Sequence, residues 1–211
     1  EGIWDIDRRF FENSGEIIVD NRSEQFQLID SGERKRLPFL TKERKSTFKA
    51  SLEKKEWTEM FTAESYGIPV RSAFGKVSGT GTGKALWTAD IKETGKYEVF
   101  FYHQVSSLTY PPISSVFTGS LLHYKVCNSL MEKEVIVEAD IIPVGWVSLG
   151  KFDFPVGKAQ VILDDRGGEI KADAEDKSAG LVQVHGVPDD KLPVKKQLII
   201  ADAVKLVRVK E

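Results

Sequence analysis

The stretch KALWTADIKETGKYEVFFYHQ, residues 84–104, indicates the fold class. In its first half, apolar side chains recur at every second position, as in a half-buried β-strand. These positions are Ala85, Trp87, Ala89 and Ile91. The second half is apolar on both faces, so we expect a strand inside a sheet that is covered on each side. The intervening KETG suits a tight turn, which predicts that the two strands are antiparallel neighbours.

Similar runs follow along the chain, separated by PVG and DDRGG segments that also suit turns. Further strands are expected at residues 16–21, 26–29, 121–127, 135–141, 158–165 and 198–209. The chain is therefore predicted to be all-β, an antiparallel two-sheet sandwich. We expect residues 16–211 to form this sandwich and residues 1–15 to extend from a larger parent protein. The core is expected to contain Trp87, Tyr97, Val99, Phe101, Trp146, Phe152 and Val161.

The composition argues against several classes of partner. A formal net charge of −2 over 211 residues gives the whole chain no electrostatic preference for nucleic acid or an anionic membrane. No apolar run approaches the ~18 residues of a membrane span, and the N-terminus lacks a signal-peptide core, so any signal is expected to have been removed. Cys127 is the single cysteine, which excludes an intrachain disulfide and a cysteine-rich metal site.

Two segments depart from the strand pattern. Residues 33–56 hold nine Lys or Arg and four Glu, and their apolar positions fit either a helix face or a strand face. We expect them to form a basic excursion from the sandwich. Residues 104–120 contain Pro111 and Pro112, which exclude a regular ladder there.

Motifs for catalysis are weak. GTGTGK, residues 79–84, suggests a phosphate-binding loop, but Ser78 and Ala85 stand where that motif needs a glycine and a hydroxyl residue. A strand also follows it instead of a helix. His103, His123 and His185 lie in no catalytic or zinc motif and are interpreted as ordinary polar strand positions.

Carboxylates gather in the C-terminal half, mostly beside Gly, Ala or Pro. They are Asp164, Asp165, Asp173, Glu175, Asp176, Asp189 and Asp190. They could form a calcium site, although a solvated acidic edge is the simpler interpretation and no cofactor is expected. Asp202 differs because its neighbours in IIADAV are apolar. We interpret it as a buried structural residue that accepts hydrogen bonds.

Aromatic side chains could stack on sugar rings. Alternation places Trp87 in the core, and Trp146, in GWVSLG at a strand start, is also expected to be structural. The better ligand candidates lie beside irregular segments. They are Trp57, Tyr66 and Tyr110, with the basic Arg34 and Lys45 favouring an anionic polymer.

A set of blocks in fixed order carries a family resemblance. The blocks are IIVDN (17–21), ALWTADIKETGKYEVFFYH (85–103), HYKV (123–126), GWVSLGKFDFPVG (145–157), VILDD (161–165) and IIADAVKLVRV (199–209). Together they resemble the golvesin or xanthan-lyase-like accessory domain at the C-termini of large exported bacterial proteins. The resemblance implies a galactose-binding-like jelly roll, generally taken to bind carbohydrate. It also implies attachment to a parent such as a lyase or a flavin-dependent oxidoreductase-like enzyme.

Two functional hypotheses remain open. In the first, the chain is a non-catalytic carbohydrate-binding accessory module of an exported protein, which is periplasmic, cell-surface or extracellular. Its partners would be polysaccharide and the catalytic region of the parent chain. In the second, the chain is a structural docking or self-association module with no glycan site. An exposed aromatic platform would favour the first, and a contiguous apolar patch remote from the loops would favour the second.

Overall fold

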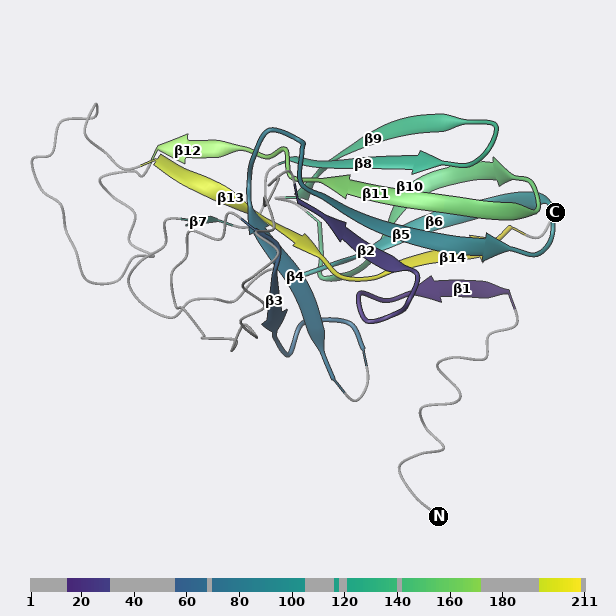
Figure 1. The fold of residues 1–211 in the computed structure, drawn as a ribbon, viewed down its shortest axis with the longest axis horizontal. Helices are drawn as coiled ribbons and strands as arrows, with labels where there is room; N and C mark the ends of the chain where they lie inside the picture. The colour runs from purple at the N-terminus through teal and green to yellow at the C-terminus, as the bar shows by residue number, and fades with distance from the viewer. Residues whose placement is uncertain are drawn as a thin grey trace, which may run out of the picture.

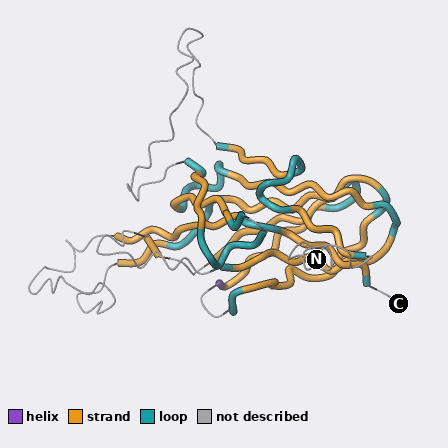
Figure 2. Tube along the Cα trace, turned by 90° about the horizontal axis from the view of Figure 1, so that it is seen from below, coloured by secondary structure: helices purple, strands orange, loops and turns teal. Residues whose placement is uncertain are grey.

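The regular structure of the protein is built from β-strands (Figures 1 and 2). The computed structural model describes residues 15–30, 56–67, 70–104, 116–117, 121–139, 142–171 and 194–209. The strands are β1 (Glu16–Val19), β2 (Phe26–Ile29), β3 (Thr58–Phe61), β4 (Ser72–Val77), β5 (Lys84–Ile91), β6 (Gly95–His103), β7 (Val116–Phe117), β8 (Leu121–Cys127), β9 (Glu132–Glu138), β10 (Gly145–Phe154), β11 (Gly157–Asp164), β12 (Glu169–Lys171), β13 (Val194–Ala201) and β14 (Val204–Arg208). The basic excursion expected at residues 33–56 lies almost entirely outside the described residues.

The strands form three sheets. Sheet A has the order β1-β14-β6-β10, sheet B has β2-β5-β11-β8-β9, and sheet C has β12-β13-β4-β3 with β7 beside β13. Neighbouring strands in the described ranges are antiparallel except β7 and β13. Sheets A and B stack face to face, and sheet C extends from one end of the stack (Figure 1). The antiparallel sandwich predicted from the sequence is confirmed, and sheet C is an element that the pattern did not predict.

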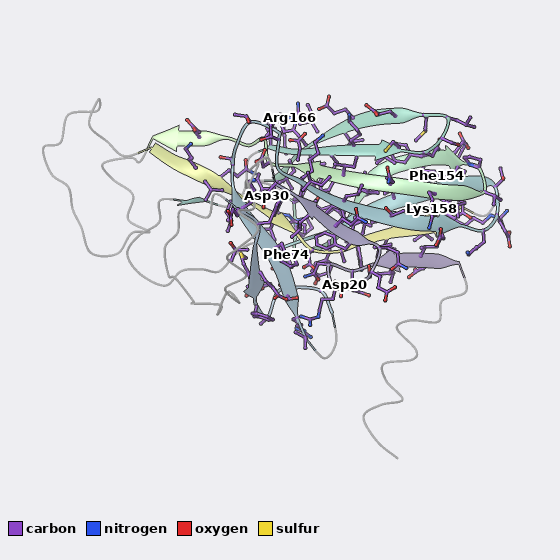
Figure 3. All side chains as sticks on the ribbon, viewed as in Figure 1. Asp20, Asp30, Phe74, Phe154, Lys158 and Arg166 are labelled. Carbon is purple, nitrogen blue, oxygen red and sulfur yellow. The ribbon has the colours of Figure 1, made fainter. Side chains whose placement is uncertain are left out.

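The core lies between sheets A and B and continues toward sheet C. Six of the seven predicted core residues are at most 4% exposed, namely Trp87, Tyr97, Val99, Phe101, Phe152 and Val161. The ring of Phe26 in β2 lies 5.3 Å from Trp87 and 5.7 Å from Phe74 in β4, centroid to centroid, and so joins the sandwich to sheet C. Phe74 and Phe154, labelled in Figure 3, lie toward opposite ends of this packed interior.

Two turns that suit hairpins in the sequence instead connect strands of different sheets. The KETG turn connects β5 in sheet B to β6 in sheet A, so the prediction that these two strands are hydrogen-bonded neighbours is wrong. Both strands bury alternate side chains in the same core from opposite sides. The turn between them must therefore form an arch that crosses from sheet B to sheet A. Within the arch, the Tyr97 hydroxyl donates to the Glu93 carbonyl at 2.8 Å, and Arg208 pairs with the Glu93 carboxylate. The second PVG turn likewise joins β10 to β11, as in jelly-roll sandwiches.

Candidate functional site

The outer face of sheet A carries aromatic side chains. In β6, alternate side chains from Tyr97 to His103 point into the core, so Phe100 and Tyr102 point outward. Strand register places Trp146 of β10 opposite Tyr102 and Lys205 of β14 opposite Phe100. Both faces of β6 are apolar for different reasons. One face fills the core, and the other forms part of this aromatic surface.

A β-bulge brings Trp146 to the outer face. Trp146 and Phe152 are an even number of residues apart, so a regular strand would point both into the core. The register of β10 shifts between Ser148 and Gly150, and Gly150 has the positive φ of +116° that glycine tolerates. The extra residue reverses the alternation. The prediction that Trp146 belongs to the core is therefore wrong: it is partly exposed, whereas Phe152 is 4% exposed.

Tyr66, Tyr102 and Trp146 form what we call the outer aromatic cluster. Ring centroids are 5.4 Å apart for Tyr66 and Tyr102, 5.1 Å for Tyr66 and Trp146, and 5.3 Å for Tyr102 and Trp146. The interplanar angles of 56°, 62° and 82° are those of tilted and edge-to-face contacts. These distances leave no gap for a ligand between the rings. All three side chains are partly exposed, so a ligand would lie against the outside of the cluster.

Lys205 adds a positive charge to this face. Its Nζ lies 4.9 Å from the Trp146 ring centroid and 5.3 Å from that of Phe100, within the range of cation–π attraction. The same Nζ is 3.8 Å from Glu16 Oε1, and the Lys205 side chain is 16% exposed. The lysine thus extends the aromatic surface while keeping its ammonium beside a carboxylate.

Burial controls the ionisation of the polar groups around the cluster. Burial, followed by the charges of Asp20, Glu16 and Asp202, raises the pKa of Tyr66. Burial also raises the pKa of Tyr102 and, despite the Asn21 backbone hydrogen bond, that of Asp20, which follows β1 (Figure 3). Both tyrosine hydroxyls therefore stay protonated around neutral pH and can donate as well as accept hydrogen bonds.

Asp202 lies beneath this face. It connects β13 to β14 and is 2% exposed. Its Oδ2 accepts hydrogen bonds from the Tyr66 backbone N–H at 2.9 Å and from Gln104 Nε2 at 3.1 Å, which is the environment that the sequence predicts. Burial raises the pKa of Asp202 to about 8, although the Tyr66 hydrogen bond opposes this shift.

The other ligand candidates from the sequence do not join the cluster in the described structure. Trp57 is 8% exposed and packs in the core, while its backbone N–H lies 3.4 Å from Asp30 Oδ2. It has no free ring face to offer a sugar, so the expectation of a stacking surface at Trp57 is wrong. Tyr110, Arg34 and Lys45 lie outside the described residues.

The glycine-rich segment GTGTGK surrounds a carboxylate of the protein itself. The Gly81 backbone N–H donates to Asp165 Oδ1 at 2.6 Å, and the Gly79 N–H donates to the Asp165 carbonyl at 2.6 Å. A Cβ at Gly83 would overlap Asp165 and the Lys76 ammonium, so this close approach needs glycine. An internal anion occupies the position that a phosphate would take, and β5 follows as the sequence predicts.

The titratable residues proposed for metal binding or catalysis lie apart or in ion pairs. Arg166 binds Asp164, and Lys76 binds Asp165. The remaining acidic candidates, Asp173, Glu175, Asp176, Asp189 and Asp190, lie outside the described residues, as does His185. Among the residues that the structure describes, no three His, Cys, Asp or Glu side chains are arranged to hold a metal ion. Burial raises the pKa of the Cys127 thiol, which makes it less reactive.

Comparison with known families identifies the chain. The sequence profile described as the Golvesin C-terminal domain matches residues 43–174. The chain belongs to the Golvesin C-terminal domain family. No curated protein sequence matches this golvesin-type domain. The described residues contain no helix that is long and apolar enough to cross a membrane.

Several solved structures resemble the golvesin-type domain at low sequence identity. The family 35 carbohydrate-binding module from Clostridium thermocellum has 7% identity and a TM-score of 0.45, over 90% of this chain and 98% of that one. The Podospora anserina GH26-CBM35 β-(1,4)-mannanase has 9% identity and a TM-score of 0.42, over 93% of this chain. This chain spans only 28% of the mannanase chain and 29% of a Phanerochaete chrysosporium exo-β-1,3-galactanase.

Tyr102, Phe100 and Lys205 are the surface residues that sequence reasoning missed. The signal for Phe100 and Tyr102 was the apolar outer face of β6, which was interpreted only as burial. No comparable signal existed for Lys205, because its aromatic neighbours come from other strands.

Proposed function

We propose that this golvesin-type domain is a non-catalytic carbohydrate-binding module and that the outer aromatic cluster is its sugar-contacting surface. The observation that carries the proposal is the grouping of Tyr66, Tyr102 and Trp146 on one partly exposed face. The flat C–H face of a pyranose matches an aromatic ring, and rings held by mutual contact lose little conformational entropy on binding. The tyrosine hydroxyls and the Lys205 ammonium would bind sugar hydroxyls at the edges of the stack.

The surroundings of the module are also part of the proposal. We infer that the parent is an exported polysaccharide-related protein, in the periplasm, at the cell surface or outside the cell. The family resemblance supports this inference. In that setting the module would hold a catalytic region of the parent close to its polymer.

A docking module is the competing proposal, and one observation favours it. Phe61 ends β3, the edge strand of sheet C, and is 65% exposed. A large exposed apolar side chain at the edge of the sheet, as far as the structure describes it, suits contact with another protein surface. The two proposals place the functional surface on different sheets, the outer face of sheet A and the β3 side of sheet C.

We expect Trp146→Ala and Tyr66→Ala each to weaken retention of a bound polysaccharide at least tenfold, because one stacked ring is worth on the order of 1.4 kcal/mol. Affinity electrophoresis of the 211-residue chain in gels with a neutral mannan, a neutral galactan or polygalacturonate measures the retention. Leu130→Ala is the control, since Leu130 is 81% exposed in the turn between β8 and β9. No retention on any of the three polymers would favour the docking module. Retention that depends on Phe61 and not on Trp146 would show that the sugar binds sheet C and not the outer aromatic cluster.

A further inference from the structure

Tyr66 differs from its two partners because no sheet holds it. Tyr102 and Trp146 are fixed by paired strands, whereas Tyr66 belongs to the segment after β3. The segment contains a turn hydrogen bond, from the Ser65 N–H to the Thr62 carbonyl at 3.3 Å, and the Arg71 guanidinium donates to the Ala63 carbonyl at 2.7 Å. Its place in the outer aromatic cluster therefore depends on contacts with the rest of the domain.

Gln104 makes the first of these contacts. It follows β6 directly and is 3% exposed. The hydroxyl oxygens of Thr62 and Ser65 lie 2.9 and 3.1 Å from Gln104 Oε1 and 2.9 Å from each other. Because each hydroxyl carries one proton, at most two of these three contacts are hydrogen bonds at any moment. Gln104 Nε2 donates to Asp202 Oδ2 at 3.1 Å, which fixes the orientation of the amide.

Asp202 makes the second contact and ties the segment to the core. Its Oδ2 accepts the Tyr66 backbone N–H at 2.9 Å, and its backbone carbonyl accepts Trp87 Nε1–H at 3.1 Å. Trp87 is 1% exposed, so Asp202 itself has a rigid attachment. Buried hydrogen-bonded networks of this kind hold one geometry because any displaced group would lose its partner in a dry environment.

We propose that Gln104 and Asp202 are positioning residues for glycan binding, which hold residues 62–67 so that Tyr66 packs on Tyr102 and Trp146. Neither side chain needs to touch the sugar. The inference rests on the proposed function, because it assigns these residues to the same face. It adds that the affinity of the outer aromatic cluster for a glycan depends on the buried Gln104 amide beneath the cluster.

Gln104→Leu tests the proposal, with Gln197→Leu as the matched control. Both side chains are buried glutamines, at 3% and 0% exposure, and Gln197 Oε1 accepts the Gly168 N–H at 2.8 Å, a contact that does not involve residues 62–67. We expect Gln104→Leu to abolish the nuclear Overhauser contacts between the Tyr66 and Trp146 rings. Affinity for the retained polymer should fall about tenfold, which corresponds to about 1.4 kcal/mol. Gln197→Leu should preserve both the ring contacts and the affinity.

The two readouts separate the possible failures. If Gln104→Leu keeps the Tyr66–Trp146 ring contacts at a temperature where it is folded, the positioning role is wrong whatever the protein binds. Loss of these contacts without loss of retention, where Tyr66→Ala does reduce retention, also contradicts it. If the unmodified chain is retained by none of the three polymers, the proposed function fails, while the ring contacts still decide whether Gln104 positions Tyr66.

Discussion

Replacing Lys76 by Met is expected to lower the free energy of unfolding by about 3–5 kcal/mol, a large part of the stability of a typical domain. The Lys76 side chain is 6% exposed, and its Nζ lies 2.6 Å from Asp30 Oδ1 and 3.2 Å from Asp165 Oδ2. Met has a similar length but no charge, so Asp165, with 3% of its side chain exposed, would become a buried carboxylate that keeps the Gly81 hydrogen bond but loses the Lys76 ammonium. Urea denaturation followed by tryptophan fluorescence measures the change.

Lys158→Met is the control for this experiment. Lys158 Nζ also lies 2.6 Å from a carboxylate, that of Asp90, but the two side chains are 64% and 42% exposed. Solvent screens such a pair, so this substitution should cost no more than about 1 kcal/mol. Equal losses for the two variants would mean that the Lys76 ion pairs are solvated and contribute little to the fold.

Asp202→Asn is expected to change how stability depends on pH. The pKa of Asp202 is raised from 3.8 to about 8 in the folded protein. Between these values the unfolded chain releases the proton and the folded chain keeps it, so rising pH favours unfolding by up to about 1.4 kcal/mol per pH unit. Asn resembles the protonated carboxyl and cannot ionise. The variant should match the unmodified protein near pH 4 and be the more stable of the two near pH 8.5.

Comparing Asp202→Asn with the unmodified protein separates the effect of Asp202 ionisation on stability from the effects of other titrating groups. Burial raises the pKa of Asp20, which shifts stability in the same direction, and burial lowers the pKa of His103, which shifts it in the opposite direction. Both groups are present in both proteins and largely cancel in the difference. Urea midpoints from pH 4 to 9 give the measurement. Parallel pH profiles for the two proteins would show that Asp202 is not held in its protonated form.

The strands and their buried faces follow from local sequence. Alternation alone predicts the interior of β5 and β11, because a strand with one buried face must place apolar side chains at every second residue. The pairing of the strands does not follow from local sequence. A four-residue KETG turn can close a hairpin or arch across a core, and only the packing of Trp87 and Phe101 in one interior selects the arch.

The residues of the candidate site are much harder to predict from the sequence than the strands. Its residues Tyr66, Tyr102, Trp146 and Lys205 come from four separate parts of the chain, and no local pattern records that they meet. The bulge at Gly150 also reversed the face of Trp146. The prediction that Trp57 is a ligand candidate was wrong for a related reason. Its irregular flanks suggested exposure, but long-range contacts bury it.

An NMR titration of the 211-residue chain shows whether sugar contacts the outer aromatic cluster. The titrant is an oligosaccharide cut from whichever of the three polymers retains the protein. We expect the indole N–H of Trp146 and the ring protons of Tyr66 and Tyr102 to shift. The indole N–H of Trp87, which is buried and bonded to the Asp202 carbonyl, should stay in place. Shifts confined to β3 and the region around Phe61, with an unchanged Trp146 indole, would show that sugar does not bind the outer aromatic cluster.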